Sequence, residues 1–197
     1  MKQINTNKKI ENALLIVDLQ NDFLDGGALG IKDSKNIIEP LNNFLKQINQ
    51  RWLIVASKDH HPKNHCSFTT WPIHCVKNTN GSQIHELSVK PRIIFKKGTK
   101  KQADSYSAFF NSQEKQTKLN KILKKHEIKN LYVCGLAFDY CVIASAIDGA
   151  KNGYNTYIIK DFTASVDVKN EKDVINKSKE NNIKIINSKD LNVQTVN

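Results

Sequence analysis

The sequence predicts a three-layer α/β/α fold, a Rossmann-like arrangement around a mainly parallel sheet of six strands. Short apolar runs without strict polar alternation predict parallel strands covered on both faces, and amphipathic stripes between them predict helices. The composition is that of a folded globular chain, because 39% of the 197 residues are apolar and 25% are charged. Disorder, collagen-like repeats and a disulfide miniprotein are excluded. We expect a single domain over residues 1–197, since no linker or repeat interrupts the pattern.

The expected elements follow one another in a regular order. The six apolar runs that predict strands are 13–19, 52–56, 92–95, 130–134, 156–159 and 183–186. One helical stripe spans 37–48, between the first two runs, and a second spans 119–126. A third helix is expected around Cys141, because apolar residues recur at helical spacing from 142 to 150. Such alternation implies right-handed crossovers, which place ligand sites at the carboxyl ends of the strands.

The segment from about 58 to 91 breaks this rhythm, because it has no convincing helical or strand pattern. It holds five of the six histidines together with Cys66 and Cys75. A loop of this length inside a compact domain is usually functional. We therefore expect a metal-binding loop.

The charge balance raises the question of acidic partners, since Lys and Arg outnumber Asp and Glu by 30 to 19. The lysines are spread along the chain, and Arg51 and Arg92 are its two arginines, so we expect no nucleic-acid partner. The apolar run 13–17 is too short for a membrane span or a signal peptide, which predicts a cytoplasmic protein with no membrane partner. Its four cysteines should then be thiols, metal ligands or a nucleophile. A partner for the basic surface and a homo-oligomer both stay open.

Two residues at predicted strand ends are candidates for nucleophilic chemistry. Asp18 follows the first apolar run, where it could also cap a turn. Cys141 lies in the first turn of the third predicted helix, where free N–H groups should lower the pKa of a thiol and could hold an oxyanion, although a cysteine there is often a small buried residue. Lys96 or Lys97, at the end of the third run, would stabilise a thiolate by direct charge. The residues alone do not choose between the two lysines.

The loop offers a candidate metal site. Asp59 and His61 alternate in the chain, so both point to one side of an extended segment, and His74 can complete a three-ligand group with open positions for water or substrate. Two other interpretations compete with it: plain surface histidines, and a closed structural zinc site. The closed site would use His65, Cys66, His74 and Cys75.

These motifs, in this order along nearly the whole chain, resemble the nicotinamidases of the isochorismatase-like cysteine hydrolase superfamily. The matching segments are VDLQNDF at 17–23, GGALG at 26–30, KDHH at 58–61, WPIHC at 71–75, FKKG at 95–98, DSYSAFF at 104–110 and GLAFDYC at 135–141. Each is weak alone, but the ordered set is specific. The chain departs from the family at Phe138, where close relatives have a small polar residue, and in the Lys-rich stretch 99–102.

The resemblance implies a role for each matching residue. The catalytic triad would be Asp18, Lys97 and Cys141, with Lys97 chosen because the family's lysine directly precedes the glycine. The metal ligands would be Asp59, His61 and His74, with His65 as an additional candidate. Phe23, Trp71 and Tyr106 would wall the substrate pocket. A cis peptide between Leu136 and Ala137 would turn the N–H groups of Ala137 and Cys141 toward an oxyanion.

The implied activity is metal-dependent hydrolysis of nicotinamide to nicotinate and ammonia through a cysteine thioester, in salvage toward NAD. The implied cofactor is one divalent metal ion, with zinc as first choice and iron or manganese as alternatives, because two histidines and one aspartate suit all three. The nearest alternative is a sister hydrolase acting on an N-carbamoyl compound or another small amide. From a different class, a non-enzymatic basic binding protein would keep the fold without the chemistry.

Overall fold

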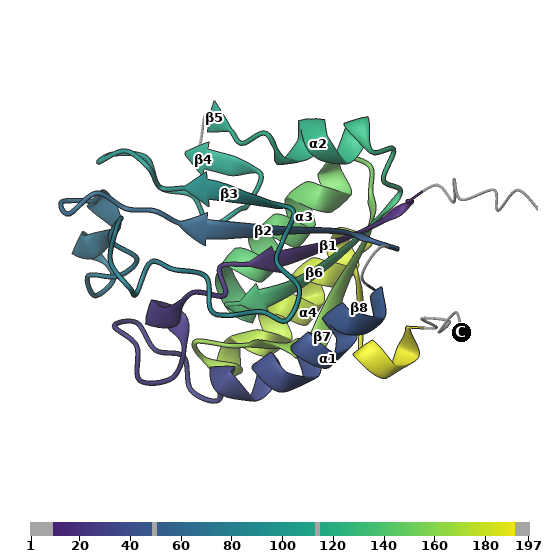
Figure 1. Ribbon diagram of the computed structural model, residues 1–197, viewed down its shortest axis with the longest axis horizontal. Coiled ribbons are helices and arrows are strands. Elements are labelled where there is room, and N and C mark those ends of the chain that lie inside the picture. The colour runs from purple at the N-terminus through teal and green to yellow at the C-terminus, as the bar shows by residue number, and fades with distance from the viewer. Residues whose placement is uncertain (1–9, 49–50, 113–114, 192–197) are drawn as a thin grey trace, which may run out of the picture.

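The computed structural model describes residues 10–48, 51–112 and 115–191, and its centre is a parallel sheet of six strands (Figure 1). The strand order is β3-β2-β1-β6-β7-β8, with every neighbouring pair parallel. The predicted fold class is therefore confirmed. The strands are β1 (Asn12–Val17), β2 (Leu53–Asp59), β3 (Ile93–Lys97), β6 (Asn130–Leu136), β7 (Asn155–Ala164) and β8 (Lys184–Ile186).

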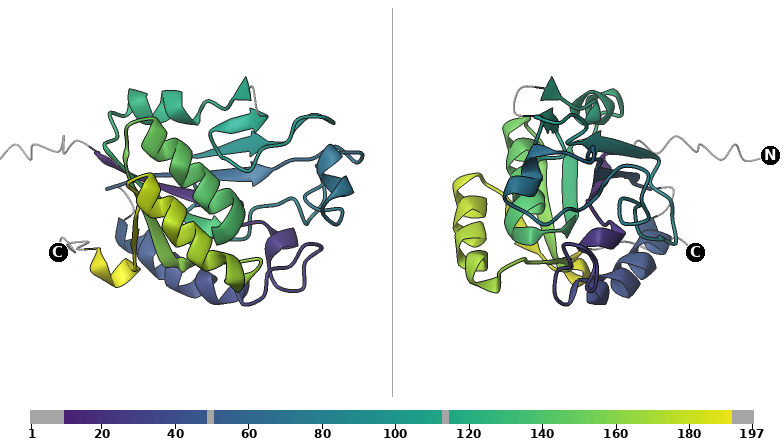
Figure 2. Two further views of the ribbon diagram at one scale, coloured as in Figure 1. Left: turned by 180° about the vertical axis from the view of Figure 1, so that it is seen from behind. Right: turned by 90° about the vertical axis from the view of Figure 1, so that its left-hand side faces the viewer.

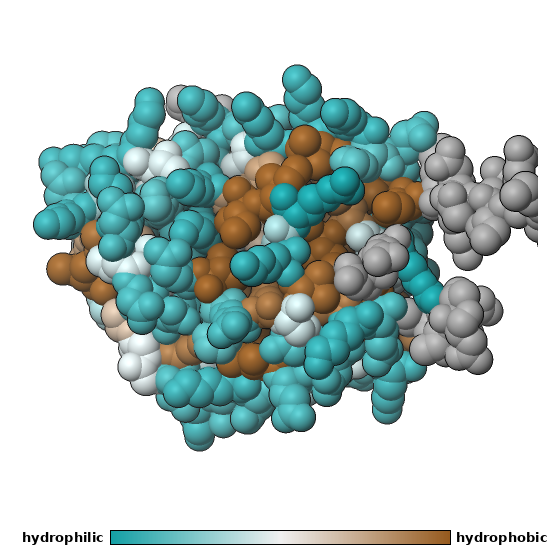
Figure 3. Space-filling view, in the orientation of Figure 1, coloured by the Kyte–Doolittle hydropathy of each residue, from teal (hydrophilic) through white to brown (hydrophobic). Residues whose placement is uncertain are grey.

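Helices cover both faces of this sheet. On one face, α1 (Ile38–Ile48) buries Leu41, Phe44 and Leu45 against β1, β2 and β6. The other face is covered by α2 (Leu119–Lys125), α3 (Ile143–Lys151) and α4 (Glu171–Glu180), seen in front in the left view of Figure 2. Figure 3 shows the α1 face, where apolar side chains gather over the middle of the sheet within a hydrophilic frame.

Two features were not predicted from the sequence. Helix α4 buries only Val174 and Ser178, a stripe too narrow to stand out in the pattern. The hairpin of β4 (Phe110–Ser112) and β5 (Lys115–Gln116) is a separate two-stranded sheet whose residues are half-buried or exposed. The long loop is largely as predicted, although β2 continues to Asp59 and a short 3₁₀ helix spans Cys66–Thr69. No helix in the described ranges is long and apolar enough to cross a membrane.

The chain reverses its direction of travel across the sheet between β1 and β6. It proceeds outward from β1 to β3, then returns to β6 beside β1 and continues to β8. Such a switch point opens a crevice at the carboxyl ends of the two central strands. Gly135 allows their close approach, because a Cβ at this position would lie 2.1 Å from the Val17 carbonyl oxygen. The division of the whole chain into one domain stays a prediction.

Candidate active site

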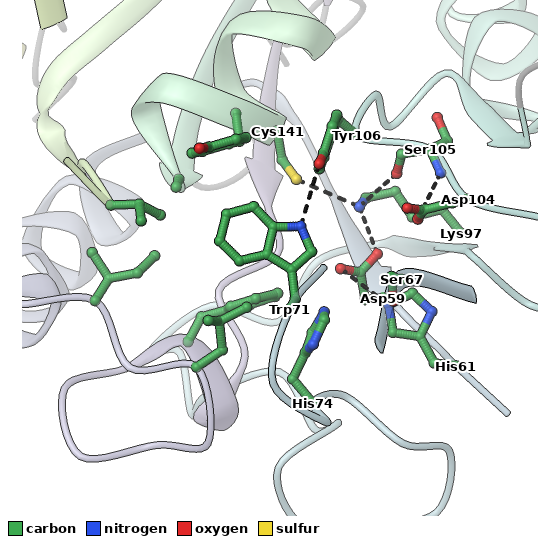
Figure 4. Close-up of a pocket in the computed structure, with 16 residues that line it drawn as sticks. Asp59, His61, Ser67, Trp71, His74, Lys97, Asp104, Ser105, Tyr106 and Cys141 are labelled. Carbon is green, nitrogen blue, oxygen red and sulfur yellow. Dashed lines mark hydrogen bonds and ion pairs between the residues drawn. The ribbon is translucent and has the colours of Figure 1, made fainter. Parts of the chain in front are cut away.

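Lys97 joins three strand ends in the crevice. Its Nζ lies 2.9 Å from Asp18 Oδ2, 2.5 Å from Asp59 Oδ1 and 3.6 Å from Cys141 Sγ. A further hydrogen bond runs to the Ser105 carbonyl oxygen at 3.0 Å (Figure 4). The Lys97 side chain is 1% exposed, whereas neighbouring Lys96 is exposed on the opposite face of β3. The structure therefore places Lys97, and not Lys96, beside the cysteine and the aspartate.

The buried lysine organises the charges around it. Burial alone would lower the pKa of Lys97, but Asp18 and Asp59 raise it well above its usual value, so the ammonium stays protonated. Burial alone would raise the pKa of Asp59, but Lys97 and His61 hold it well below its usual range. At Asp18 burial wins and raises the pKa, although Lys97 and a 2.8 Å hydrogen bond from Ser57 Oγ oppose it. Asp18 is thus the more basic of the two carboxylates.

The prediction of a lowered pKa at Cys141 is wrong for the structure without substrate. Burial raises the pKa of Cys141 well above its usual value, and the charges of Asp18 and Asp59 add to this effect. Lys97 lowers the pKa, but one ammonium does not outweigh two carboxylates and complete burial. Cys141 is therefore a neutral thiol at rest, and its proton must leave before the sulfur can attack.

The turn that carries Cys141 begins directly after β6. Residues Phe138–Val142 form one turn of π-helix that leads into α3, with extended Ala137 as its N-terminal neighbour. The Ala137 carbonyl oxygen accepts hydrogen bonds from the N–H groups of Tyr140 and Val142. The peptide bond between Leu136 and Ala137 is cis, as the resemblance implied. Cys141 lies in the opening turn, although that turn is π and not α.

Asp59, His61 and His74 form a buried group whose ligand atoms lie within 4.8 Å of one another. His61 Nδ1 donates to the Gly98 carbonyl oxygen at 3.0 Å, and His74 Nδ1 donates to the Pro72 carbonyl oxygen at 2.6 Å. A carbonyl can only accept, so in the neutral form of each ring Nε2 carries the lone pair that can bind a ligand. Backbone support of this kind is typical of metal-binding histidines. The donor set therefore fits a divalent cation.

His65 does not join this group. Its Nε2 donates to the Ala103 carbonyl oxygen at 3.1 Å, and its Nδ1 accepts from the Ser67 N–H at 3.2 Å, so both ring nitrogens are engaged. The His65 ring stacks on the ring of His61, with the two centroids 3.9 Å apart, and so restricts the movement of this candidate ligand.

The closed zinc site is not assembled either, because among the described residues neither Cys66 nor Cys75 lies in a group of possible ligands with the histidines. Burial raises the pKa of the Cys75 thiol. The Cys75 N–H donates to Asp22 Oδ2 at 2.7 Å, and this hydrogen bond holds the loop in place.

Cys141, Lys97 and the group of possible metal ligands line one pocket (Figure 4). Phe23, Trp71 and Tyr106, which the resemblance implied as walls of the substrate pocket, line it. Trp71 Nε1 donates to Tyr106 Oη at 3.3 Å, and both rings contact Tyr140.

Sequence reasoning missed several lining residues. The position of Tyr140 directly before Cys141 could have indicated it, but no local signal marks the apolar lining residues Leu29, Ile31 and Val166.

Comparisons with known proteins agree with this geometry. Residues 12–190 match the isochorismatase domain family. The nicotinamidase of Escherichia coli (strain K12) is 38% identical over 179 residues, covering 79% of this chain and 84% of the relative. The zinc complex of Pyrococcus horikoshii pyrazinamidase superposes with a TM-score of 0.84 at 36% identity, covering 90% of this chain and 99% of the other. The nicotinate complex of PnC1 from L. infantum gives a TM-score of 0.85 at 33% identity, with coverage of 92% and 94%.

Proposed function

Since this chain belongs to the isochorismatase family and, within it, to the nicotinamidases, we propose that it hydrolyses nicotinamide to nicotinate and ammonia. One observation carries the proposal. Lys97 Nζ contacts Asp18, Cys141 and Asp59 together, so the groups suited to amide cleavage adjoin the group suited to a metal ion. An N-carbamoyl substrate is not favoured, because curated relatives above 30% identity are named nicotinamidases, whereas the N-carbamoylsarcosine amidase of Thermoplasma acidophilum is 21% identical.

Acylation begins with a proton transfer to Asp18, the more basic carboxylate. As the proton leaves Cys141 Sγ, the nearby Lys97 ammonium stabilises the thiolate, which attacks the carboxamide carbon. The oxyanion that forms would accept hydrogen bonds from the N–H groups of Ala137 and Cys141. Asp18 then returns its proton to the leaving nitrogen. Ammonia departs and leaves a thioester on Cys141.

Deacylation uses the same carboxylate in reverse order. With ammonia gone, Asp18 accepts a proton from a water molecule, and the resulting hydroxide attacks the thioester carbon. Collapse of the second tetrahedral intermediate expels the Cys141 thiolate, which regains its proton from Asp18. The product forms as nicotinic acid and gives its proton to the solvent to become nicotinate, and the site returns to its starting protonation. Two moderate steps thereby replace one difficult amide hydrolysis.

Asp59, His61 and His74 would hold one divalent metal ion, with zinc as first choice and iron or manganese as alternatives. When bound, such an ion supplies a Lewis-acid position for the lone pair of the pyridine nitrogen. Phe23, Trp71 and Tyr106 would pack around the ring and hold the carboxamide over Cys141 Sγ. The product suggests a place in salvage toward NAD.

The proposal is tested by ammonia release from nicotinamide and benzamide, with metal analysis of the same sample. Benzamide has the same carboxamide and nearly the same shape but no ring nitrogen, so its kcat/KM should be lower by at least ~10²-fold. His61→Ala should shrink that preference, because the ring nitrogen loses its partner. Equal rates on both amides in the metal-loaded enzyme would contradict the proposed role of the metal site. No ammonia from nicotinamide would contradict the proposed function itself.

A further inference from the structure

Two lining residues mark the mouth of the pocket, because they line it and are also exposed to solvent. Tyr106 is 43% exposed and Val166 is 42% exposed. Val166 belongs to the segment 165–170 that follows β7, and it also borders a wider groove lined by residues from 32–37 and 160–171. It therefore separates the enclosed pocket from the open groove. A side chain in this position contacts whatever part of a ligand extends toward solvent.

Segment 165–170 is held in place by Asp139, which lies two residues before Cys141. Asp139 Oδ1 accepts a hydrogen bond from the Val166 N–H at 2.9 Å. Asp139 Oδ2 accepts from the Asp167 N–H at 3.0 Å and from Asn170 Nδ2 at 3.1 Å. One carboxylate thus fixes the backbone of Val166 to the turn that carries the nucleophile.

We propose that Val166 determines which ring substituents the enzyme accepts, and that Asp139 is the positioning residue that makes this selection strict. The inference rests on the proposed function. The apolar Val166 side chain offers no hydrogen bond, so it selects substrates by steric fit. Steric selection requires that the backbone of Val166 does not move away from the substrate. The hydrogen bonds to Asp139 hold the backbone in place. Val168, on the same segment, is 72% exposed, borders only the groove and provides a matched control.

The test compares nicotinamide with its four ring-methylated isomers, using kcat/KM for ammonia release relative to nicotinamide. Val166→Ala should raise this ratio about tenfold for the isomer whose methyl group meets Val166, and Val166→Phe should lower it for the same isomer. Val168→Ala and Val168→Phe should leave all four ratios within twofold. Flat ratios in both Val166 variants, or equal changes in the Val168 variants, would overturn the assignment of Val166.

Asp139→Asn tests the positioning role, because the amide has one acceptor oxygen where the carboxylate has two, so it cannot accept from the Val166 N–H and from the other two donors at the same time. It should shift the same isomer in the direction of Val166→Ala and raise KM for nicotinamide more than it lowers kcat. Asn170→Ala, which removes one of the three bonds, should give a smaller shift. A lower thermal midpoint with unchanged ratios would show a merely structural role. Failure of the wild-type enzyme on nicotinamide itself would overturn the proposed function, whereas flat ratios alone overturn only this inference.

Discussion

Cys141 and Asp18 come from the ends of two adjacent strands and should act as one unit. We predict that Cys141→Ala and Asp18→Asn each lower kcat by at least ~10³-fold, and that the double variant is no worse than either single one. The reason is that a thiol without its base and a base without its thiol are equally unproductive. Steady-state ammonia release measures the effect, and circular dichroism checks the fold. Substantial turnover by Cys141→Ala would refute the assignment of the nucleophile.

Lys97 and Lys96 form a matched pair for the next experiment. Lys97→Met should abolish turnover and lower the free energy of unfolding by about 3–5 kcal/mol, because two buried carboxylates lose their shared partner. Lys96→Met should change turnover by less than twofold, since this side chain is exposed. Urea titration and ammonia release measure both quantities. The opposite ranking would mean that Lys96, and not Lys97, supports the site.

The sequence predicted most of the site residues but not how they affect one another. Asp18 and Cys141 can be recognised locally because each follows an apolar strand. The choice between Lys96 and Lys97 cannot be made locally. Ile94 and Phe95 are both apolar, so the alternation that would assign side chains to the faces of β3 is missing. The pKa of Cys141 was predicted wrongly because burial raises it, and because the carboxylates that add to this effect arrive from β1 and β2, far away in the chain. The place of Val166 in the pocket lining was not predictable for a similar reason, because it depends on contacts between segments that are far apart in the chain.

At the scale of elements, the start of α4 is joined to β7 through one carboxylate. Glu171 Oε1 accepts from Lys160 Nζ at 2.8 Å and from Ser165 Oγ at 2.7 Å. Burial opposes ionisation, but these two bonds hold the pKa of Glu171 below its usual value. Because the folded pKa is lowered, the associated stability is present above the unfolded pKa of about 4.3 and is lost as the pH falls through the folded pKa.

Glu171→Gln should therefore destabilise the protein by about 0.5–1 kcal/mol at neutral pH, and the difference from wild type should close in acid. Urea midpoints measured from pH 7 down to pH 3 provide the test. Asp173→Asn on the same helix is the control, because its pair with Lys177 is largely exposed and should contribute little. A difference that grows toward low pH would show that the sign is wrong.

The long loop from about 58 to 91 illustrates a limit of prediction for a single element. Its length and histidine content predicted a site, and the spacing of Asp59 and His61 predicted a shared direction. Which histidines remain available was not predictable, because the deciding acceptors are the backbone carbonyls of Gly98, Pro72 and Ala103. His65 differs from His74 only in these contacts, which depend on how the loop folds against the end of β3.

At the scale of the whole molecule, the candidate metal group lies near the carboxyl ends of the strands, and the sheet is stabilised by an apolar core that does not include this group. We predict that a chelator lowers the thermal midpoint by roughly 5–10 °C, the linkage expected for an ion present at about 100 times its Kd, and leaves the far-UV spectrum at 25 °C unchanged. His61→Ala should show no such chelator-dependent shift. Unfolding at 25 °C on chelation would point to a structural metal instead.

The fold as a whole was predictable because its signal is repeated. Six apolar runs without polar alternation indicate a covered parallel sheet even when each boundary is off by a few residues. Strand β7 shows the limit, since it continues to Ala164, well past the predicted end at 159, where polar residues enter. Helix α4 was missed because a helix over the sheet edge buries few side chains. The position of α4 is determined by packing against the sheet and not by a pattern in its own sequence.

The position of β3 has a consequence for how molecules of this protein meet one another. It is an outer strand of the sheet, only five residues long, and its last part is covered by the hairpin, where the Gly98 N–H donates to the Asn111 carbonyl oxygen. Short outer strands that expose lysine pair poorly with a strand from another molecule. We therefore expect Lys96 to oppose strand pairing between molecules at the same strand end where Lys97 is proposed to serve catalysis.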